Sequence, residues 1–177
     1  MLDLEDLKYP AGRFKKNLAL TSDERKACIE AIADCPDLLL KAVGGFSEEQ
    51  FDTAYREGGW TVRQLVHHMF DSHANAFIRF RLALTEPNPL IKAYDQNAWA
   101  HLPDSILAPA DISVRLLKGL HERWVIMLKE MTLEQFARTM EHPQNGPMSL
   151  DVVVQMYAWH GHHHVRHITA LSEREGW

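Results

Sequence analysis

The chain has 177 residues, of which 46% are hydrophobic and 24% charged, proportions that fit one soluble globular domain and exclude a disordered or fibrous protein. The formal net charge of −5 provides no basic surface for nucleic acid, and no apolar run approaches the roughly 18 residues that suggest a membrane span. Residues 1–16 lack the apolar segment of a signal peptide, so we expect a cytoplasmic protein.

The cysteine content agrees with that compartment. Cys28 and Cys35 are the two cysteines of the chain. On one helix, seven residues place them about 10 Å apart along the axis, which exceeds the roughly 7 Å limit for a disulfide. We therefore expect two free thiols in a reducing environment.

The first predicted helix covers about residues 21–43. Thr21 and Glu24 have the spacing of a capping box, and Gly44 ends the segment. Pro36 lies inside it, which predicts a kink or break because proline supplies no backbone N–H.

A short turn at 47–51 and a loop at 53–59 lead to the second predicted helix, about 62–84. Thr61 provides its N-terminal cap and Pro87 stops it. The apolar residues recur at helical spacing, which indicates one buried face. These residues are Val62, Leu65, Val66, Met69, Ala76, Phe77 and Phe80.

Residues 88–109 are predicted to form a long loop with one short helix near 95–100. Loops of this length in compact domains are usually functional or disordered. The third helix is expected at about 112–131, with Asp111 as its cap, and is followed by a short turn at 132–136.

Residues 142–148 are rich in turn formers and predict a chain break. Ser149 then caps the fourth helix, about 150–174, and no segment shows the sustained alternation of a strand. The prediction is an all-α protein, a single domain over 1–177, folded as a four-helix bundle with a long crossover between the second and third helices.

The unusual feature of the composition is histidine, because five of the 11 histidines fall within residues 160–167. At 100° per residue, with His160 at 0°, the apolar stripe of the fourth helix is centred near 50°. His164 at 40° lies within the stripe together with His160. His167 and His163 lie on its flank, whereas His162, near 200°, faces solvent.

Two neutral imidazoles on one apolar stripe each need a polar partner, and one metal ion would satisfy both. A third ligand should come from a facing helix, where the second helix offers His67, His68 and His73. His73 lies on the apolar stripe and is as consistent with core packing as with ligation. His67 and His68 flank the stripe on opposite sides, so periodicity does not choose between them. Three isolated histidines are interpreted as surface or loop residues: His101, His121 and His142.

Several segments together resemble the DinB superfamily, most closely its YfiT-like branch of metal-dependent hydrolases related to bacillithiol transferases. The two signature segments are GGWTVRQLVHHMFDSH (58–73) and YAWHGHHHVRHITALSEREGW (157–177). The resemblance extends along nearly the whole chain. It includes LKYPAGRF (7–14), IRFRLALTE (78–86), YDQNAW (94–99) and LHERW (120–124).

The resemblance implies a bundle that carries one divalent cation on three histidines. In the superfamily the first ligand follows the helix-starting Trp-Ser/Thr by eight residues, which from Trp60 implies His68. The other two ligands are an i, i+4 pair on the last helix, which implies His160 and His164. His67 remains an alternative to His68. Many members follow the last ligand with Arg-Gly-Gln, whereas this chain has Val-Arg-His at 165–167, as in the YfiT-like branch.

Three protein ligands would leave an open coordination position, which is typical of catalytic sites. Zinc or nickel suits imidazole ligands. A metal-bound water would make the protein a hydrolase of a small molecule, whereas a metal-bound low-molecular-weight thiol would make it a thiol S-transferase. A non-catalytic metal-binding bundle is the third alternative. Candidate proton-transfer groups are His163, His167 and Asp71, although a solvated charge is the better interpretation of Asp71. Related bundles often form homodimers, an expectation that no feature of this sequence supports by itself.

Overall fold

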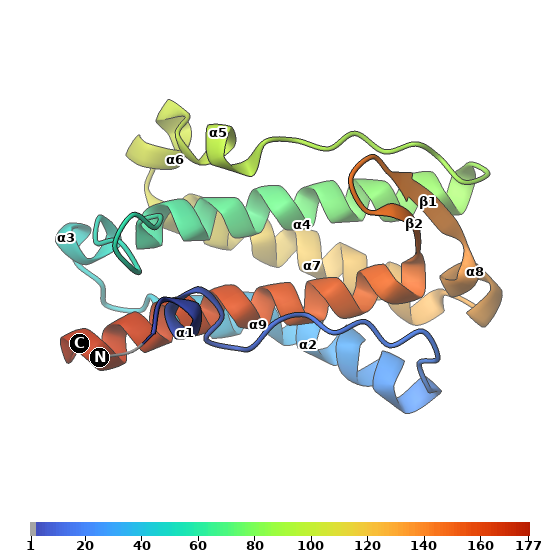
Figure 1. The fold of residues 1–177 in the computed structure, drawn as a ribbon, viewed down its shortest axis with the longest axis horizontal. Helices are drawn as coiled ribbons and strands as arrows, with labels where there is room; N and C mark the ends of the chain where they lie inside the picture. Colours follow the sequence, from blue (N-terminus) through green and yellow to red (C-terminus); the bar gives the residue numbers. More distant parts are fainter. Residues whose placement is uncertain (1–2) are drawn as a thin grey trace.

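Residues 3–177 are described by a computed structural model, and its four long helices form a bundle (Figure 1). The four helices are α2 (Ser22–Ala42), α4 (Val62–Thr85), α7 (Ala110–Glu130) and α9 (Leu150–Glu175). Helix α2 packs against α9 and α7, and α4 packs against the same two helices. Each long helix therefore has two neighbours, and the predicted four-helix bundle is confirmed. Within residues 3–177, no helix has both the length and the apolar character that crossing a bilayer requires.

Short elements join and cover the long helices. They are α1 (Leu4–Lys8), α3 (Glu48–Phe51), α5 (Gln96–Ala100), α6 (Pro103–Leu107) and α8 (Leu133–Ala137). Figure 1 shows α4 and α7 running in the same direction, because the segment that contains α5 and α6 returns along the bundle between them. This is the crossover that was expected, although it contains two short helices rather than one.

Side-chain caps define where three of the long helices begin, and the hydroxyl of Ser149, which accepts from the backbone N–H of Val152, caps α9 as expected. Thr21 and Glu24 form the expected capping box before α2, and Thr61 and Gln64 form the one before α4. The expected Asp111 cap is wrong: Pro109 occupies the N-cap of α7, and Asp111 lies in its first turn.

The helix break predicted at Pro36 does not form in α2. Helix α2 continues through Pro36, which is buried. The carbonyl of Ile32, four residues earlier, loses its helical donor at this point because proline has no N–H. That carbonyl takes its hydrogen bond from another helix, as described below.

A small hairpin was missed. Strands β1 (Thr139–His142) and β2 (Gly146–Ser149) pair antiparallel, with His142 opposite Gly146. Each strand has four residues, too few to show the alternation on which a strand prediction depends. The turn formers in this segment therefore mark a hairpin turn, where Gly146 adopts a positive φ of 68°.

The hydrophobic core is divided into two clusters by a layer of histidines. One cluster contains Phe80, Trp124 and Leu150, and the other contains Leu65, Leu117 and Ile168. Along α4, α7 and α9, the sequence passes from one cluster to the other through histidines, namely His73 on α4, His121 on α7, and His160, His163 and His164 on α9. A polar layer across the middle of a bundle is costly unless its members are bonded or bind a ligand.

Candidate metal centre

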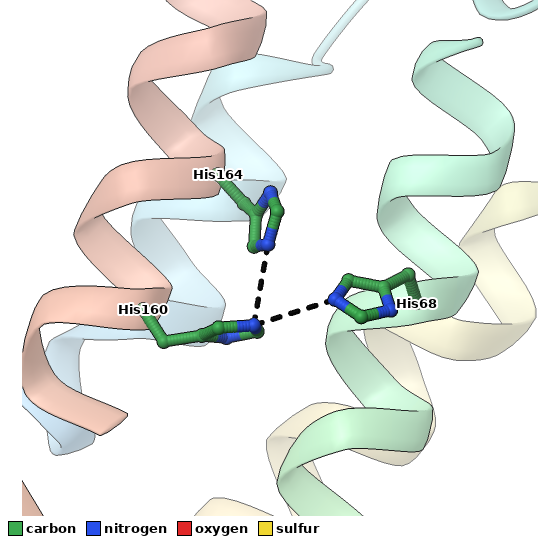
Figure 2. Close-up of side chains that lie close together, drawn as sticks. All are labelled: His68, His160 and His164. Atoms are coloured by element: carbon green, nitrogen blue, oxygen red, sulfur yellow. Dashed lines mark hydrogen bonds between the residues drawn. The ribbon is translucent and has the colours of Figure 1, made fainter. Parts of the chain in front are cut away.

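Helices α4 and α9 bring three histidines together, with a ring nitrogen of each pointing toward the others (Figure 2). The Nε2 atom of His160 lies 3.3 Å from Nε2 of His68 and 3.2 Å from Nε2 of His164. One ligand nitrogen from each of the three residues lies within 4.8 Å of the others. The structure thus assembles the three residues that the family resemblance implied as metal ligands.

These separations fit coordination of one small cation. Zinc–nitrogen bonds of about 2.0–2.1 Å in tetrahedral geometry place two ligand nitrogens about 3.3–3.4 Å apart. His68 comes from α4, and His160 and His164 come from successive turns of α9, so both helices would be fixed by the same ion. Three protein ligands would leave one position for water or substrate.

The proton positions on His164 can be read from its hydrogen bonds. The carbonyl of Lys8 can only accept, so His167 donates to it from Nε2, at 3.1 Å. The other nitrogen of a neutral His167, Nδ1, then accepts a hydrogen bond from the Nδ1–H of His164, at 3.3 Å. His164 therefore carries its proton on Nδ1, and its Nε2 presents a lone pair to the cluster.

Burial keeps the cluster uncharged. It lowers the pKa of His68 to about 4, with a further contribution from His163, and lowers the pKa of His160 and His164 well below the usual value. All three imidazoles are therefore neutral at pH 7, which is the form that binds a metal ion.

His67, the alternative first ligand, points elsewhere. Its Nδ1 lies 2.7 Å from Oγ of Ser113, and its Nε2 lies 3.1 Å from the carbonyl of Ala108. Both ring nitrogens are therefore engaged with the start of α7 and the residues before it. The structure places His68, not His67, at the cluster.

The three residues considered for proton transfer have different surroundings. His163 is buried, and its Nδ1 has no hydrogen-bond partner among residues 3–177. His167 is bonded through both nitrogens, as described above, so it orients His164. Asp71 is half-buried; burial and then Asp104 raise its pKa to about 6, and it does not line the cavity at the cluster. His162 is exposed, as the helical phase predicted.

A cavity of about 410 Å³ opens at the cluster. Aromatic rings of its wall pack on the histidines: Trp159 stacks on His163 at 4.4 Å between ring centroids, and Trp60 lies 4.7 Å from His68. The remaining wall comes from the N-terminal segment, the loop before α4, and helices α4, α5 and α9. Its residues are Lys8, Tyr9, Tyr55, Arg56, Gly58, Gly59, Leu65, Gln96, Asn97, His160, His164 and His167. The centre is accessible to a small molecule.

The interpretation of His121 as a surface or loop residue is wrong, because only 1% of His121 is exposed. Its Nε2 lies 2.8 Å from Nδ1 of His73, which is itself fully buried and in contact with His160. The sequence did contain the signal: His121 lies four residues after Leu117 and three before Trp124, on the apolar stripe of its helix. His101, in contrast, is exposed, and His142 is partly buried in β1.

Comparison with known proteins agrees with a four-helix bundle and with a metal-dependent protein. The sequence profile of the DinB superfamily matches residues 31–168. Two relatives named "Putative metal-dependent hydrolase", from Bacillus cereus and Bacillus anthracis, are each 48% identical over 174 residues, which is 98% of this chain and 100% of theirs. The structure of YfiT from Bacillus subtilis, described as a probable metal-dependent hydrolase with an unusual four-helix bundle topology, matches with a TM-score of 0.95. It is 43% identical, and the match covers 97% of this chain and 99% of that one.

Proposed function

The chain belongs to the DinB superfamily, and from this membership we propose that it is a metal-dependent hydrolase whose ion is held by His68, His160 and His164. The observation that carries the proposal is the convergence of three Nε2 atoms from neutral imidazoles, two of them buried and that of His160 half-buried. The hydrogen bond to His167 leaves the Nε2 of His164 unprotonated, and one cation bound among the three Nε2 atoms would satisfy their lone pairs. Zinc or nickel suits this donor set.

A bound divalent ion supplies Lewis acidity and makes a coordinated water a nucleophile near neutral pH. The protein supplies the surroundings. His163 is the best-placed proton acceptor, since its Nδ1 is unpartnered in the described chain and a nitrogen of its ring lies within 4.8 Å of one on His164. Burial, followed by His167 and His162, lowers the pKa of His163 to about 3, so the ring is neutral at pH 7 and only weakly basic.

The test is hydrolysis of a panel of aryl esters and anilides by protein loaded with zinc or nickel. We expect turnover that disappears on chelation and in His68→Ala, and that is retained in His162→Ala, which removes an exposed histidine of α9. Metal-independent cleavage would contradict the proposal.

The open position of the same site would also accept a thiolate, which is the chemistry of a thiol S-transferase. A parallel assay of thiol conjugation to monochlorobimane separates the two reactions. Metal-dependent conjugation without ester or amide cleavage would replace hydrolysis by thiol transfer as the function.

A further inference from the structure

The cavity at the histidine cluster carries positive charge that no acidic side chain of its wall balances. Lys8 and Arg56 line it, and no Asp or Glu of the described chain does so. Neither cation forms an ion pair within residues 3–177. Since the whole protein has a net charge of −5, this positive region is local to the cavity.

Arg56 is held in place by uncharged partners. Its Nε donates to the Tyr55 hydroxyl at 3.0 Å, and its Nη1 donates to the carbonyl of Glu57 at 2.8 Å. Both partners are neutral, so the guanidinium presents an uncompensated positive charge to the cavity that it lines.

The metal ligands add no negative charge either. All three are neutral imidazoles, so a divalent ion bound to them keeps its full charge, unlike an ion held by carboxylates. The aromatic walls meanwhile offer flat apolar surfaces beside the cluster, in Trp60 and Trp159.

We propose that the substrate is a small organic anion whose carboxylate or phosphate group is bound by Lys8 and Arg56 and whose apolar part lies against Trp60 and Trp159. This proposal rests on the proposed function, because it places the bond to be cleaved at the metal centre. Opposite charge in a partly desolvated cavity favours such a ligand over its neutral analogue.

Binding to the zinc-loaded protein, followed by ligand-observed NMR or calorimetry, tests the proposal with matched pairs: hippurate against hippuramide, and benzyl phosphate against benzyl alcohol. We expect the anion of at least one pair to bind about 10-fold more tightly, and the better anion identifies the headgroup. The preference should disappear in Lys8→Gln/Arg56→Gln and remain in Lys41→Gln, which changes an exposed lysine at the end of α2. A preference that survives in the double variant would mean that the metal alone binds the anion, and it would overturn the proposal. Equal or undetectable binding of the anion and the neutral compound in both pairs would also overturn it.

The outcomes distinguish this proposal from the proposed function. Anion binding that depends on Lys8 and Arg56 without any hydrolysis would retain the ligand class and reject the hydrolase. Hydrolysis of neutral and anionic esters at equal rates, with equal binding, would retain the hydrolase and reject the ligand class.

A second inference follows from an independent observation, the hydrogen bond between α2 and α7. Nδ1 of His121 lies 2.6 Å from the carbonyl oxygen of Ile32, which has no helical donor because residue 36 is proline. A carbonyl only accepts, so His121 carries a proton on Nδ1. Burial lowers the pKa of His121 to about 4, so the ring is neutral and its Nε2 is an acceptor.

Two further histidine rings are hydrogen-bonded in series with His121. His73 donates from Nδ1 to Nε2 of His121 at 2.8 Å, and His160 donates from Nδ1 to Nε2 of His73 at 3.0 Å. His160 therefore has its proton on Nδ1, and its Nε2 lone pair faces His68 and His164.

We infer that Pro36 and His121 are positioning residues of the metal centre, since together they fix the tautomers of three histidines in series. Because the Ile32 carbonyl can only accept, each ring in the series donates from its Nδ1. The last ring, His160, therefore presents an unprotonated Nε2 to the ion. His73 bonds directly to His160, and His121 acts on that ligand through His73.

Zinc affinity, measured by competition with a chromophoric chelator, tests the second inference beside the free energy of unfolding. We expect His121→Phe to weaken zinc binding about 10- to 100-fold. His121→Gln, which keeps one donor and one acceptor, should recover most of the affinity. Pro36→Ala returns an N–H to the Ile32 carbonyl, so it should weaken zinc binding without lowering stability, a combination that a purely structural role does not produce.

The tautomer of His160 gives a readout that does not depend on metal affinity. Two-bond ¹H–¹⁵N correlation spectra of the metal-free protein should show a protonated Nδ1 and an unprotonated Nε2. Protonation at Nε2, or unchanged zinc affinity in a folded His121→Phe protein, would overturn the inference.

Discussion

Gly161 packs directly against Cys35 where α9 meets α2. A Cβ atom built on Gly161 would lie 2.6 Å from Sγ of Cys35 and 3.7 Å from Cε1 of His73. Helices α2 and α9 therefore approach closely beside His160, and a residue without a side chain permits this approach.

Replacing Gly161 by alanine should consequently destabilise the protein by about 1–3 kcal/mol, because the added methyl group overpacks the α2–α9 contact. Gly119, within α7, is the matched control, since a Cβ there meets nothing within 4 Å. Gly119→Ala should raise stability by about 0.5–1 kcal/mol through helix propensity alone. Urea denaturation of both variants measures the difference, and equal effects would show that the contact is unimportant.

Removing one inward histidine should abolish tight metal binding while leaving the bundle folded. We expect His164→Ala to weaken zinc binding by more than about 100-fold, since a ligand is lost as well as its orientation. His162→Ala, on the exposed side of the same helix, should bind zinc as the unmodified protein does. Circular dichroism checks the fold, and similar losses in both variants would contradict the assignment of the ligands.

Acid should destabilise the metal-free protein. Burial lowers the pKa of His68 and of His121 to about 4, whereas an unfolded histidine has a pKa of about 6.5. Between these values the unfolded chain binds more protons than the folded one, so the free energy of unfolding falls as pH decreases from about 6.5 to about 4. At pH 5 the loss is about 2 kcal/mol for a single such histidine. Urea denaturation at pH 7 and pH 5 measures it; equal stability at both would mean that the histidine layer is already solvated.

The bundle could be predicted from sequence because helix caps and apolar periodicity are local signals. Thr21 with Glu24, and Thr61 with Gln64, begin α2 and α4 in the structure as in the prediction. The hairpin 139–149 was not predictable in the same way, because each strand pairs over four residues and is held by its partner rather than by its own pattern.

The inward and outward sides of the histidine cluster were also predictable, since helical phase separates His164 from His162. The contacts of His121 were not, because its partners Ile32 and His73 come from two other helices. The sequence identified Pro36 as a residue that removes a helical N–H. Only the packed structure shows that His121 donates instead to the carbonyl of Ile32.

The central claim is that His68, His160 and His164 hold one divalent ion through their Nε2 atoms. X-ray absorption spectroscopy of the protein reconstituted with zinc tests it most directly, with the metal content of the same sample measured by mass spectrometry. We predict about one zinc per chain, with three imidazole nitrogens at about 2.0–2.1 Å and at least one further light ligand. Absence of bound zinc, or a first shell with fewer than three imidazoles, would contradict the account.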